Sequence, residues 1–293
     1  MAYTLIILSA FFTSLYFVFT KMYQKTEGTS AYAGFRFTGA SGLITVIVFW
    51  CANGFSMELS LYSLLMAFLQ SAFTTAYTLV SLHLMKMGTM ALYTLFLMTG
   101  GMIVPYYMGL LFLDEPSTLI KTIGLVVTVI GVVITNISKE KINFKLLVLC
   151  ILVFFFNGGV STVSKLHQVE KVYETVGTND FIILTGFAKV VISCVAMIFF
   201  RNTKEVSPEF ESKRKTLHWI FPCIFAVAVS SVSSYIQLDG ARTIDASIIY
   251  PIITGGTIVF TALCARLFFK EKLSKSVIAS ILLCSLGIVL FSM

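Results

Sequence analysis

Charged residues are scarce in this sequence. Asp, Glu, Lys and Arg make up 12% of its 293 residues and 57% are hydrophobic, whereas about 25% of a typical soluble domain is charged. The mean hydropathy is +0.92. No connection between the long apolar runs exceeds about 16 residues, which leaves no room for a soluble catalytic, nucleotide-binding or nucleic-acid-binding domain. We therefore expect a membrane protein with no nucleic-acid partner.

The sequence also lacks the clusters that hold metals or perform catalysis. The six cysteines stand singly, without a CxxC pair, so we interpret them as small apolar side chains. His83, His167 and His218 are scattered, and no Asp or Glu stands at the centre of an apolar run. These absences predict that the protein is not an enzyme and holds no metal or cofactor. A scaffold would need a long loop or tail, and neither is present.

What the sequence does have is ten long apolar runs. A helix needs about 20 mainly apolar residues to cross the hydrocarbon core of a bilayer. The predicted fold class is therefore an all-α integral membrane protein with ten transmembrane helices. Because the first run has no charged start and no cleavage site of small residues, we expect it to be retained as a helix. The runs cover approximately 2–20, 31–51, 61–82, 88–113, 117–136, 145–164, 180–200, 217–238, 244–269 and 274–292.

Lysine and arginine are distributed unevenly over the nine connections between these runs. The odd-numbered connections contain fifteen of the 21 basic residues and the even-numbered ones contain four. By the positive-inside rule, the odd connections face the cytoplasm and both termini lie outside. The remaining two basic residues, Arg36 and Lys189, lie inside apolar runs, away from the connections.

The two halves of the sequence resemble each other. "LFLMTGGMIV" at 95–104 matches "YPIITGGTIV" at 250–259, and "FVFTK" at 17–21 matches "STVSK" at 161–165. The chain thus contains two five-helix domains, over 2–138 and 144–293. Because five is odd, the two must cross the membrane in opposite senses, which predicts an inverted repeat. Such repeats place a substrate site near the midplane and work by alternating access.

At these residues the chain resembles the drug/metabolite transporter superfamily, specifically proteins with two tandem EamA-type domains. The resemblance covers nearly the whole chain. It implies a ten-helix basket, a central cavity lined mainly by the first, third, fourth, sixth, eighth and ninth helices, and a role in moving small metabolites, often outward. The residues that carry it are a turn glutamate, a helix glycine and a helix-end lysine in each half, and one arginine: Glu115 and Glu271, Gly131 and Gly287, Lys21 and Lys165, and Arg36.

The sequence departs from the family pattern in two places. The proline usual in the fourth helix of each half is present as Pro251, but the first half has no proline near Phe96 and has Pro105 later. The second half also has no arginine that matches Arg36. Family members are often drawn with cytoplasmic termini, whereas the distribution of basic residues here predicts external termini.

Lys189 stands near the middle of an apolar run, in "TGFAKVVISCV" at 185–195, where the first half has Gly42. A lysine at the bilayer centre costs roughly 2.5–3.5 kcal/mol on insertion scales, so it usually faces the bundle interior or a wet cavity. One interpretation is an electrostatic site for a substrate carboxylate or phosphate. The other is a structural lysine bonded to helix-end carbonyls or a buried acid. Arg36 is a candidate gate or interhelix clamp, or it snorkels to the interface.

Polar stripes on the third and eighth helices predict the lining of a cavity, because large polar groups that face lipid would be unsatisfied. The alternative is close packing of small residues. Asn157, followed by two glycines, can offer a donor and an acceptor to a ligand or mark a close helix contact. The candidate binding residues of the stripes are Gln70, Thr74, Tyr77, Ser234, Tyr235 and Gln237, with Tyr93 and Tyr250 nearby and Pro251 as a second gate candidate.

The sequence thus predicts a secondary transporter of small polar metabolites that works without ATP. We expect it to export amino acids or related zwitterions or anions across a plasma membrane, in bacteria the inner membrane, as a monomer or homodimer. Its expected partners are the lipid bilayer and a small-molecule substrate. The preference for a zwitterion or anion rests on Lys189 and on the lack of a midplane acid. The alternative is a facilitator or importer of a cationic or sugar-like solute.

Overall fold

The architecture is all-helical. The computed structural model describes residues 2–27, 30–86, 90–136, 144–201, 220–270 and 274–291, and within these ranges the chain forms ten α-helices and no strand. In chain order the helices are α1 (Ala2–Glu27), α2 (Ala31–Ala52), α3 (Leu61–Lys86), α4 (Met90–Phe112), α5 (Leu119–Asn136), α6 (Phe144–Val169), α7 (Thr178–Phe199), α9 (Ile220–Thr243), α10 (Ala246–Phe269) and α11 (Lys275–Phe291).

Eight of the described helices are long and apolar enough to cross a membrane, and α5 and α11 are apolar but shorter. Many of their outward-facing side chains are large and apolar, such as Leu61, Leu267 and Phe199. A contiguous apolar surface of this kind suits hydrocarbon, and helices satisfy their backbone hydrogen bonds there without water. The chain is therefore a multi-pass helical membrane protein, as the apolar runs predict.

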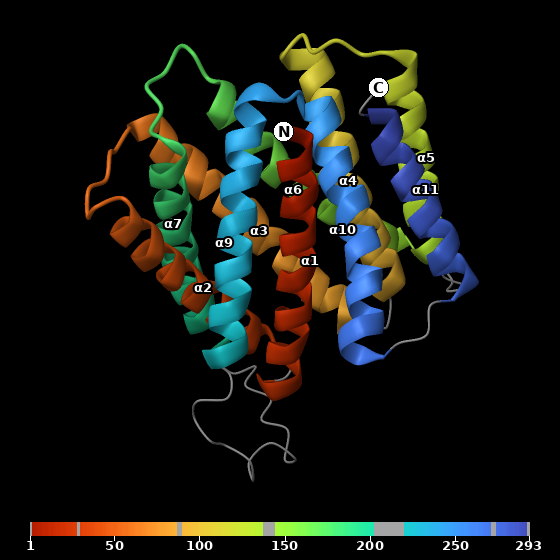
Figure 1. The fold of residues 1–293 in the computed structure, drawn as a ribbon. Coiled ribbons are helices and arrows are strands. Elements are labelled where there is room, and N and C mark those ends of the chain that lie inside the picture. The colour runs from red at the N-terminus through yellow and green to blue at the C-terminus, as the bar shows by residue number, and fades with distance from the viewer. Residues whose placement is uncertain are drawn as a thin grey trace.

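Most of the closest helix contacts join opposite halves of the chain. α1 packs against α9 and α10, and α6 packs against α3 and α4. α2 packs against α7 at one edge of the bundle and α5 packs against α11 at the other (Figure 1). Each of these contacts joins segments far apart in sequence, so the fold is one interleaved bundle.

Glycines allow the peripheral pair α5 and α11 to approach closely. A Cβ at Gly287 would collide with the Thr128 hydroxyl and lie 3.1 Å from the Gly124 carbonyl oxygen. A Cβ at Gly131 would lie 2.9 Å from Cys284 Sγ. Small residues that let backbones approach are the usual basis of helix packing in membranes. Gly131 and Gly287, which the family resemblance singles out, thus have a packing role.

The largest described apolar core lies around α10. It contains Ile6 of α1, Met102 and Tyr106 of α4, Ile249 of α10 and Phe291 of α11, all nearly inaccessible. Since α10 contacts α1, α4 and α11, this core joins the two halves of the chain at the end of the bundle that carries the termini.

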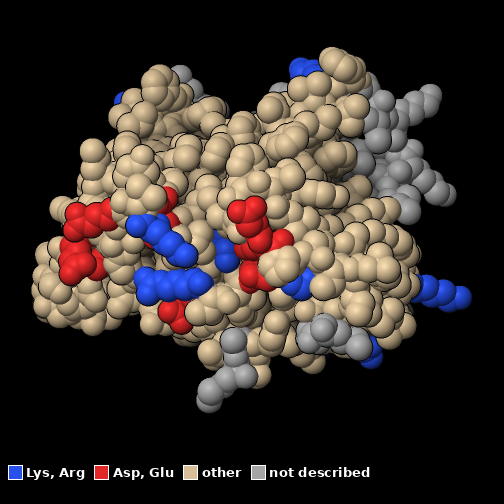
Figure 2. Space-filling model, turned by 90° about the horizontal axis from the view of Figure 1, so that it is seen from above, with Lys and Arg blue, Asp and Glu red and all other residues tan. Residues whose placement is uncertain are grey.

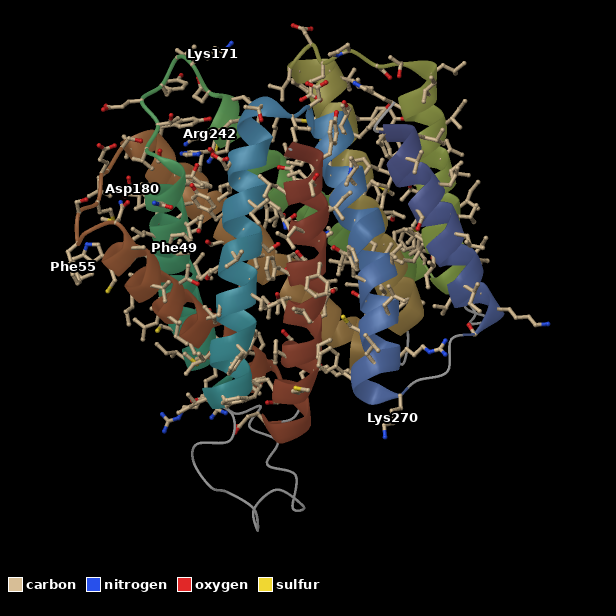
Figure 3. The ribbon with its side chains drawn as sticks, in the orientation of Figure 1. Phe49, Phe55, Lys171, Asp180, Arg242 and Lys270 are labelled. Carbon is tan, nitrogen blue, oxygen red and sulfur yellow. The ribbon has the colours of Figure 1, made fainter. Side chains whose placement is uncertain are left out.

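Both termini lie at one end of the bundle (Figure 1). Lys171 and Arg242 lie toward this end and Lys270 lies at the opposite end (Figure 3). The end with the termini carries acidic and basic side chains side by side (Figure 2). We call it the terminal face.

The helices at two of the expected connections are longer than the apolar runs indicate. α1 continues to Glu27 and α6 continues to Val169, so Lys21 and Lys165 lie inside helices. Lys165 is also buried, although its position in the sequence assigns it to a connection between spans. Lys165 can be buried there because its ammonium group donates hydrogen bonds to backbone carbonyl oxygens.

Candidate functional site

A hydrogen-bonded polar network joins α1 to α9. Thr13 Oγ1 and Ser233 Oγ lie 2.7 Å apart, and Ser233 Oγ donates to the Ser9 carbonyl oxygen at 2.8 Å. Gln237 Nε2 donates to Ser233 Oγ at 2.8 Å and to Thr13 Oγ1 at 3.3 Å. No described residue donates to Gln237 Oε1. The candidate Gln237 is therefore held in place by its amide nitrogen while its carbonyl oxygen can accept a hydrogen bond.

A similar contact joins α3 to α6. Gln70 Nε2 donates to Ser164 Oγ at 2.9 Å, and the Thr74 hydroxyl donates to the Gln70 backbone carbonyl at 2.9 Å. Gln70 Oε1 is buried and accepts no hydrogen bond from the part of the chain that the structure describes. A buried amide oxygen without a donor is costly. Both glutamines predicted to line a cavity thus bridge helices through the amide nitrogen, and neither amide oxygen accepts a hydrogen bond from a described residue.

The aromatic candidates of the polar stripes occupy different environments. Tyr77 on α3 is half-buried, whereas Tyr235 on α9 is 42% exposed and its neighbour Ser234 is exposed. Tyr93 lies in α4, but its side chain is outside the described residues, as is Glu271. The structure brings Gln237 together with Thr13, but Tyr235 is not part of that network.

Asn157 fastens α6 to α4 where these helices cross closely. Its Nδ2 donates to the Leu97 carbonyl oxygen at 2.7 Å. A Cβ at Gly101 would lie 2.6 Å from that nitrogen, and a Cβ at Gly100 would collide with the backbone of Phe154. The close helix contact is therefore present, and it uses one of the donors that Asn157 could offer to a ligand.

Tyr250 and Pro251 are both buried in α10. The Tyr250 hydroxyl donates to the Ser161 carbonyl oxygen of α6 at 2.7 Å. Pro251 lies inside α10, and Pro105 lies inside α4. A proline inside a helix removes one hydrogen bond of the helix ladder. α4 and α10 thus carry this interruption at different heights, since Pro105 follows "TGG" and Pro251 precedes it.

Lys189 lies on α7 where this helix crosses α2. A Cβ at Gly42 would lie 3.1 Å from Lys189 Cβ and 2.6 Å from the Gly186 carbonyl oxygen. Lys189 is half-buried and forms no hydrogen bond or ion pair with any described residue. Among the described residues it therefore lacks the bond to a helix-end carbonyl or to an acid that a structural lysine would make. A cationic group without a protein partner is able to pair with an anionic ligand.

Arg36 contacts α1. It forms an ion pair with Glu27 and its Nε donates to the Tyr23 hydroxyl at 3.5 Å. The Tyr23 hydroxyl in turn donates to the Ala33 carbonyl oxygen of α2 at 3.1 Å. These contacts link the end of α1 to the beginning of α2, so the geometry matches an interhelix clamp between neighbouring helices.

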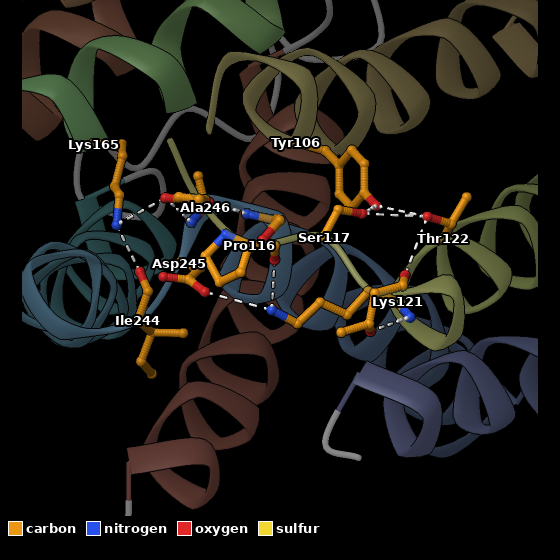
Figure 4. A network of polar contacts seen from close by, with 12 residues as sticks. Tyr106, Pro116, Ser117, Lys121, Thr122, Lys165, Ile244, Asp245 and Ala246 are labelled. Carbon is orange, nitrogen blue, oxygen red and sulfur yellow. Dashed lines mark hydrogen bonds and ion pairs between the residues drawn. The ribbon is translucent and has the colours of Figure 1, made fainter. Parts of the chain in front are cut away.

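A charged cluster lies at the terminal face, where the turn between α4 and α5 meets the turn between α9 and α10 (Figure 4). Glu115 accepts backbone hydrogen bonds from Ala246 at 2.7 Å and Ser247 at 3.0 Å. Lys165 Nζ donates to the carbonyl oxygens of Ala241 at 3.0 Å and Ile244 at 2.7 Å. It also lies 3.4 Å from Glu115 Oε1, and both side chains are only 6% exposed.

Sequence reasoning does not identify this cluster as a site. It assigns Glu115 to a turn and Lys165 to a connection, where both would be solvated. The signal that could have found it is the recurrence of a lysine and a glutamate at equivalent positions of the two halves. A charge that recurs beside apolar residues suggests a partner, because an unpaired buried charge is costly.

His167 is a second buried polar residue that sequence reasoning leaves unassigned. Its Nε2 lies 2.8 Å from Ser63 Oγ, and its ring stacks on Phe181 with centroids 3.7 Å apart. Ser63 Oγ also accepts from the Val176 N–H at 3.0 Å. The contacts join α3, α6 and the turn before α7, so they have a structural role.

The described residues form no metal centre, and one cavity of known volume has an apolar lining. These contain no group of three His, Cys, Asp or Glu side chains that could hold a metal, and the six cysteines form no disulfide. A cavity of about 460 Å³ lies between α3 and α7. Its lining is apolar and includes Val195 and Phe199, which are exposed on the outside of the bundle. It is suited to hydrocarbon and not to a polar solute.

Comparison with known proteins supports the fold alone. One solved structure, described as "Crystal structure of protein", matches with a TM-score of 0.78 and 13% identity over 99% of this chain and 95% of that chain. In all, 26 chains of solved structures match. No protein-family model matches the sequence, and no curated protein matches it. At 13% identity the match shows a shared architecture and nothing of chemistry.

The polar groups described above are of kinds that can hydrogen-bond or ion-pair with a small solute. They consist of amide oxygens, hydroxyl groups and one lysine, held by helices that meet from both halves of the chain. Such groups recognise a ligand by hydrogen bonds and charge.

Proposed function

We infer that the protein is a secondary transporter of small polar metabolites, in particular amino acids or related zwitterions or anions. In this proposal it belongs to the drug/metabolite transporter superfamily with two EamA-type repeats. It exports its substrate across a plasma membrane, the inner membrane in bacteria, by alternating access. All ten described helices span the membrane, including α5 and α11.

The correspondence of helix contacts supports an inverted repeat and is the observation that carries the proposal. When α1 to α5 are matched with α6, α7, α9, α10 and α11, the contacts of α1 with α9 and α10 correspond to those of α6 with α3 and α4. The pairs α2 with α7 and α5 with α11 each join matched helices. This exchange is expected for two repeats related by an axis in the membrane plane, which is typical of alternating-access transporters.

The chemistry of the polar groups supports a zwitterionic or anionic substrate. Gln70 Oε1 and Gln237 Oε1 can accept hydrogen bonds from an ammonium group. Lys189 can pair with a carboxylate or phosphate. Every described Asp and Glu lies in a turn or within a few residues of a helix end, so a purely cationic substrate would lack a counter-charge at mid-membrane. The argument for an anionic group depends on Lys189.

Transport assays in proteoliposomes test this proposal. Purified protein is reconstituted and solute counterflow is measured for amino acids, nucleosides, sugar phosphates and quaternary amines, with empty liposomes as the control. The expected result is saturable counterflow of an amino acid or a related metabolite, together with ligand-induced thermal stabilisation, since a ligand that binds only the folded state raises the melting temperature. Counterflow of quaternary amines or sugars alone would favour the alternative, a facilitator or importer of cationic or sugar-like solutes. Absence of counterflow for every class would contradict transport of such metabolites.

A further inference from the structure

The turn that joins α9 to α10, residues 244–245, is held by side chains that come from other helices. The first N–H groups and the last carbonyl groups of a helix have no partner within that helix. At the start of α10 the N-cap residue Asp245 supplies no side-chain hydrogen bond to the backbone. Glu115 supplies it instead, with one carboxylate oxygen on the Ala246 N–H and the other on the Ser247 N–H (Figure 4).

The free carbonyl groups at the end of α9 find a donor in the same way, from a side chain of another helix. Lys165 of α6 donates to the carbonyl oxygens of Ala241 and Ile244. A carboxylate at a helix start and an ammonium at a helix end both complement the helix dipole. Glu115 and Lys165 also face each other at 3.4 Å. The carboxylate of this ion pair therefore caps the start of α10, and its ammonium group caps the end of α9.

The contact crosses between the two halves of the chain. Glu115 belongs to the first half, whereas Lys165 and the α9–α10 turn belong to the second. A second link crosses beside it, because Lys121 Nζ of α5 lies 3.4 Å from Asp245 Oδ2 and donates to the Pro116 carbonyl oxygen at 3.1 Å. Separation of the α4–α5 turn from the α9–α10 turn would break both links at once.

We propose that Glu115 and Lys165 form a lock that closes the terminal face in the conformation described here, and that this face opens to solvent only when Glu115 leaves the start of α10. The proposal rests on the transport function above, since a lock of this kind serves alternating access. Polar contacts suit such a role because water can replace each partner at the membrane surface.

Gly109 of α4 holds Glu115 in position. The Glu115 N–H donates to the Gly109 carbonyl oxygen at 3.1 Å, and a Cβ at Gly109 would collide with the Glu115 carboxylate. Gly109→Ala is therefore expected to displace the carboxylate without removing any charge, and alanine favours the helix itself. This variant weakens the proposed lock by a route independent of Glu115→Gln.

Cysteine labelling at the two ends of the bundle tests the lock without a substrate. In a background that lacks the six native cysteines, a single cysteine replaces Ser161, one helical turn before Lys165, or Phe17, the equivalent position of α1 toward the opposite end. Labelling by a membrane-impermeant maleimide is measured in lipid nanodiscs, where both faces meet solvent.

We expect Glu115→Gln and Gly109→Ala to raise labelling at position 161 and lower it at position 17, each by about tenfold. Asp114→Asn, an exposed neighbour with a φ of 50° that asparagine tolerates, should change neither.

Each outcome bears on the lock separately from transport. Unchanged labelling at both positions in a folded variant overturns the lock even when counterflow is normal. Increased labelling at position 161 without the decrease at position 17 also overturns it, because Glu115 would then be a local helix cap only. The opposed changes support the lock whether or not a substrate has been found. If Glu115→Gln does not fold, Gly109→Ala gives the same test.

Discussion

Lys189 Cβ lies against the bare backbone of Gly42, where an added Cβ would approach it to 3.1 Å. The two residues occupy equivalent positions, since "TGASG" at 38–42 matches "TGFAK" at 185–189. The glycine of the first half thus leaves room for the stem of the lysine in the second. In the inverted repeat proposed above, equivalent positions meet where the axis that relates the two halves passes, so this contact agrees with an axis through the crossing of α2 and α7.

Gly42→Ala is expected to destabilise the crossing of α2 and α7. The new Cβ would lie 2.6 Å from the Gly186 carbonyl oxygen, and a helix backbone cannot rotate aside as a side chain can. Overpacking of this kind typically costs about 1–3 kcal/mol. Thermal unfolding in detergent measures the loss. Gly177→Ala is the control, since its Cβ would make an ordinary contact of 3.6 Å with Asp180, and equal melting temperatures for the two variants would contradict the prediction.

Lys189→Gln is expected to abolish transport while the fold is retained. No described residue pairs with the ammonium group, so its removal leaves no buried acid without a partner. Removal of an unpaired charge from a membrane helix is also favourable by roughly 2.5–3.5 kcal/mol on insertion scales, so Lys189→Met should melt no lower than the wild type. Counterflow and thermal unfolding are measured together, with the exposed Lys171→Gln as the control. Normal counterflow by Lys189→Gln would remove the basis for an anionic substrate.

The helices could be predicted from the sequence because the bilayer imposes a length on each apolar run. The ends of the helices could not. α6 continues past the apolar run to Val169, since Lys165 finds the carbonyl oxygens of Ala241 and Ile244 there. A hydropathy scale scores every lysine as unfavourable in a span. It contains no information on a hydrogen-bond partner such as the Ala241 carbonyl oxygen, 76 residues further along the chain.

The candidate site could be predicted only by residue type. The polar stripes select Gln70 and Gln237 by residue type, but their hydrogen-bond partners, Ser164 and Thr13, lie on helices of the opposite half. A stripe on one helix does not identify the helix that faces it. The same limit applies to Asn157, whose contact with Leu97 depends on how closely α4 approaches α6.

Asn157→Asp tests whether this residue has a structural role in addition to any contact with substrate. The substitution preserves shape but removes the donor to the Leu97 carbonyl oxygen and places a carboxylate against it. A lost hydrogen bond between membrane helices costs about 0.6–2 kcal/mol, so a lower melting temperature is expected. Asn179→Asp is the matched control, because it also removes one amide donor, the bond from Asn179 Nδ2 to Asn53 Oδ1 at 3.2 Å, but in the first turn of α7, where a negative charge is favourable. Unchanged melting of Asn157→Asp with weaker substrate binding would assign the residue to binding alone.

Gln237→Leu is expected to weaken substrate binding without loss of the fold. The Thr13 and Ser233 hydroxyl groups still bond each other at 2.7 Å, whereas the amide oxygen offered to a substrate ammonium is lost. A hydrogen bond between a neutral amide oxygen and a charged ammonium group contributes about 1.5–3 kcal/mol. Its loss should therefore raise the KM of counterflow by roughly tenfold or more. Ser230→Ala is the control, because its hydroxyl bonds only the Val227 carbonyl oxygen of its own helix. Equal KM values for these two variants would place Gln237 outside the binding site. In a separate variant, Gln237→Glu, a gain of quaternary amine counterflow would show that the side-chain oxygen faces the amine of the solute.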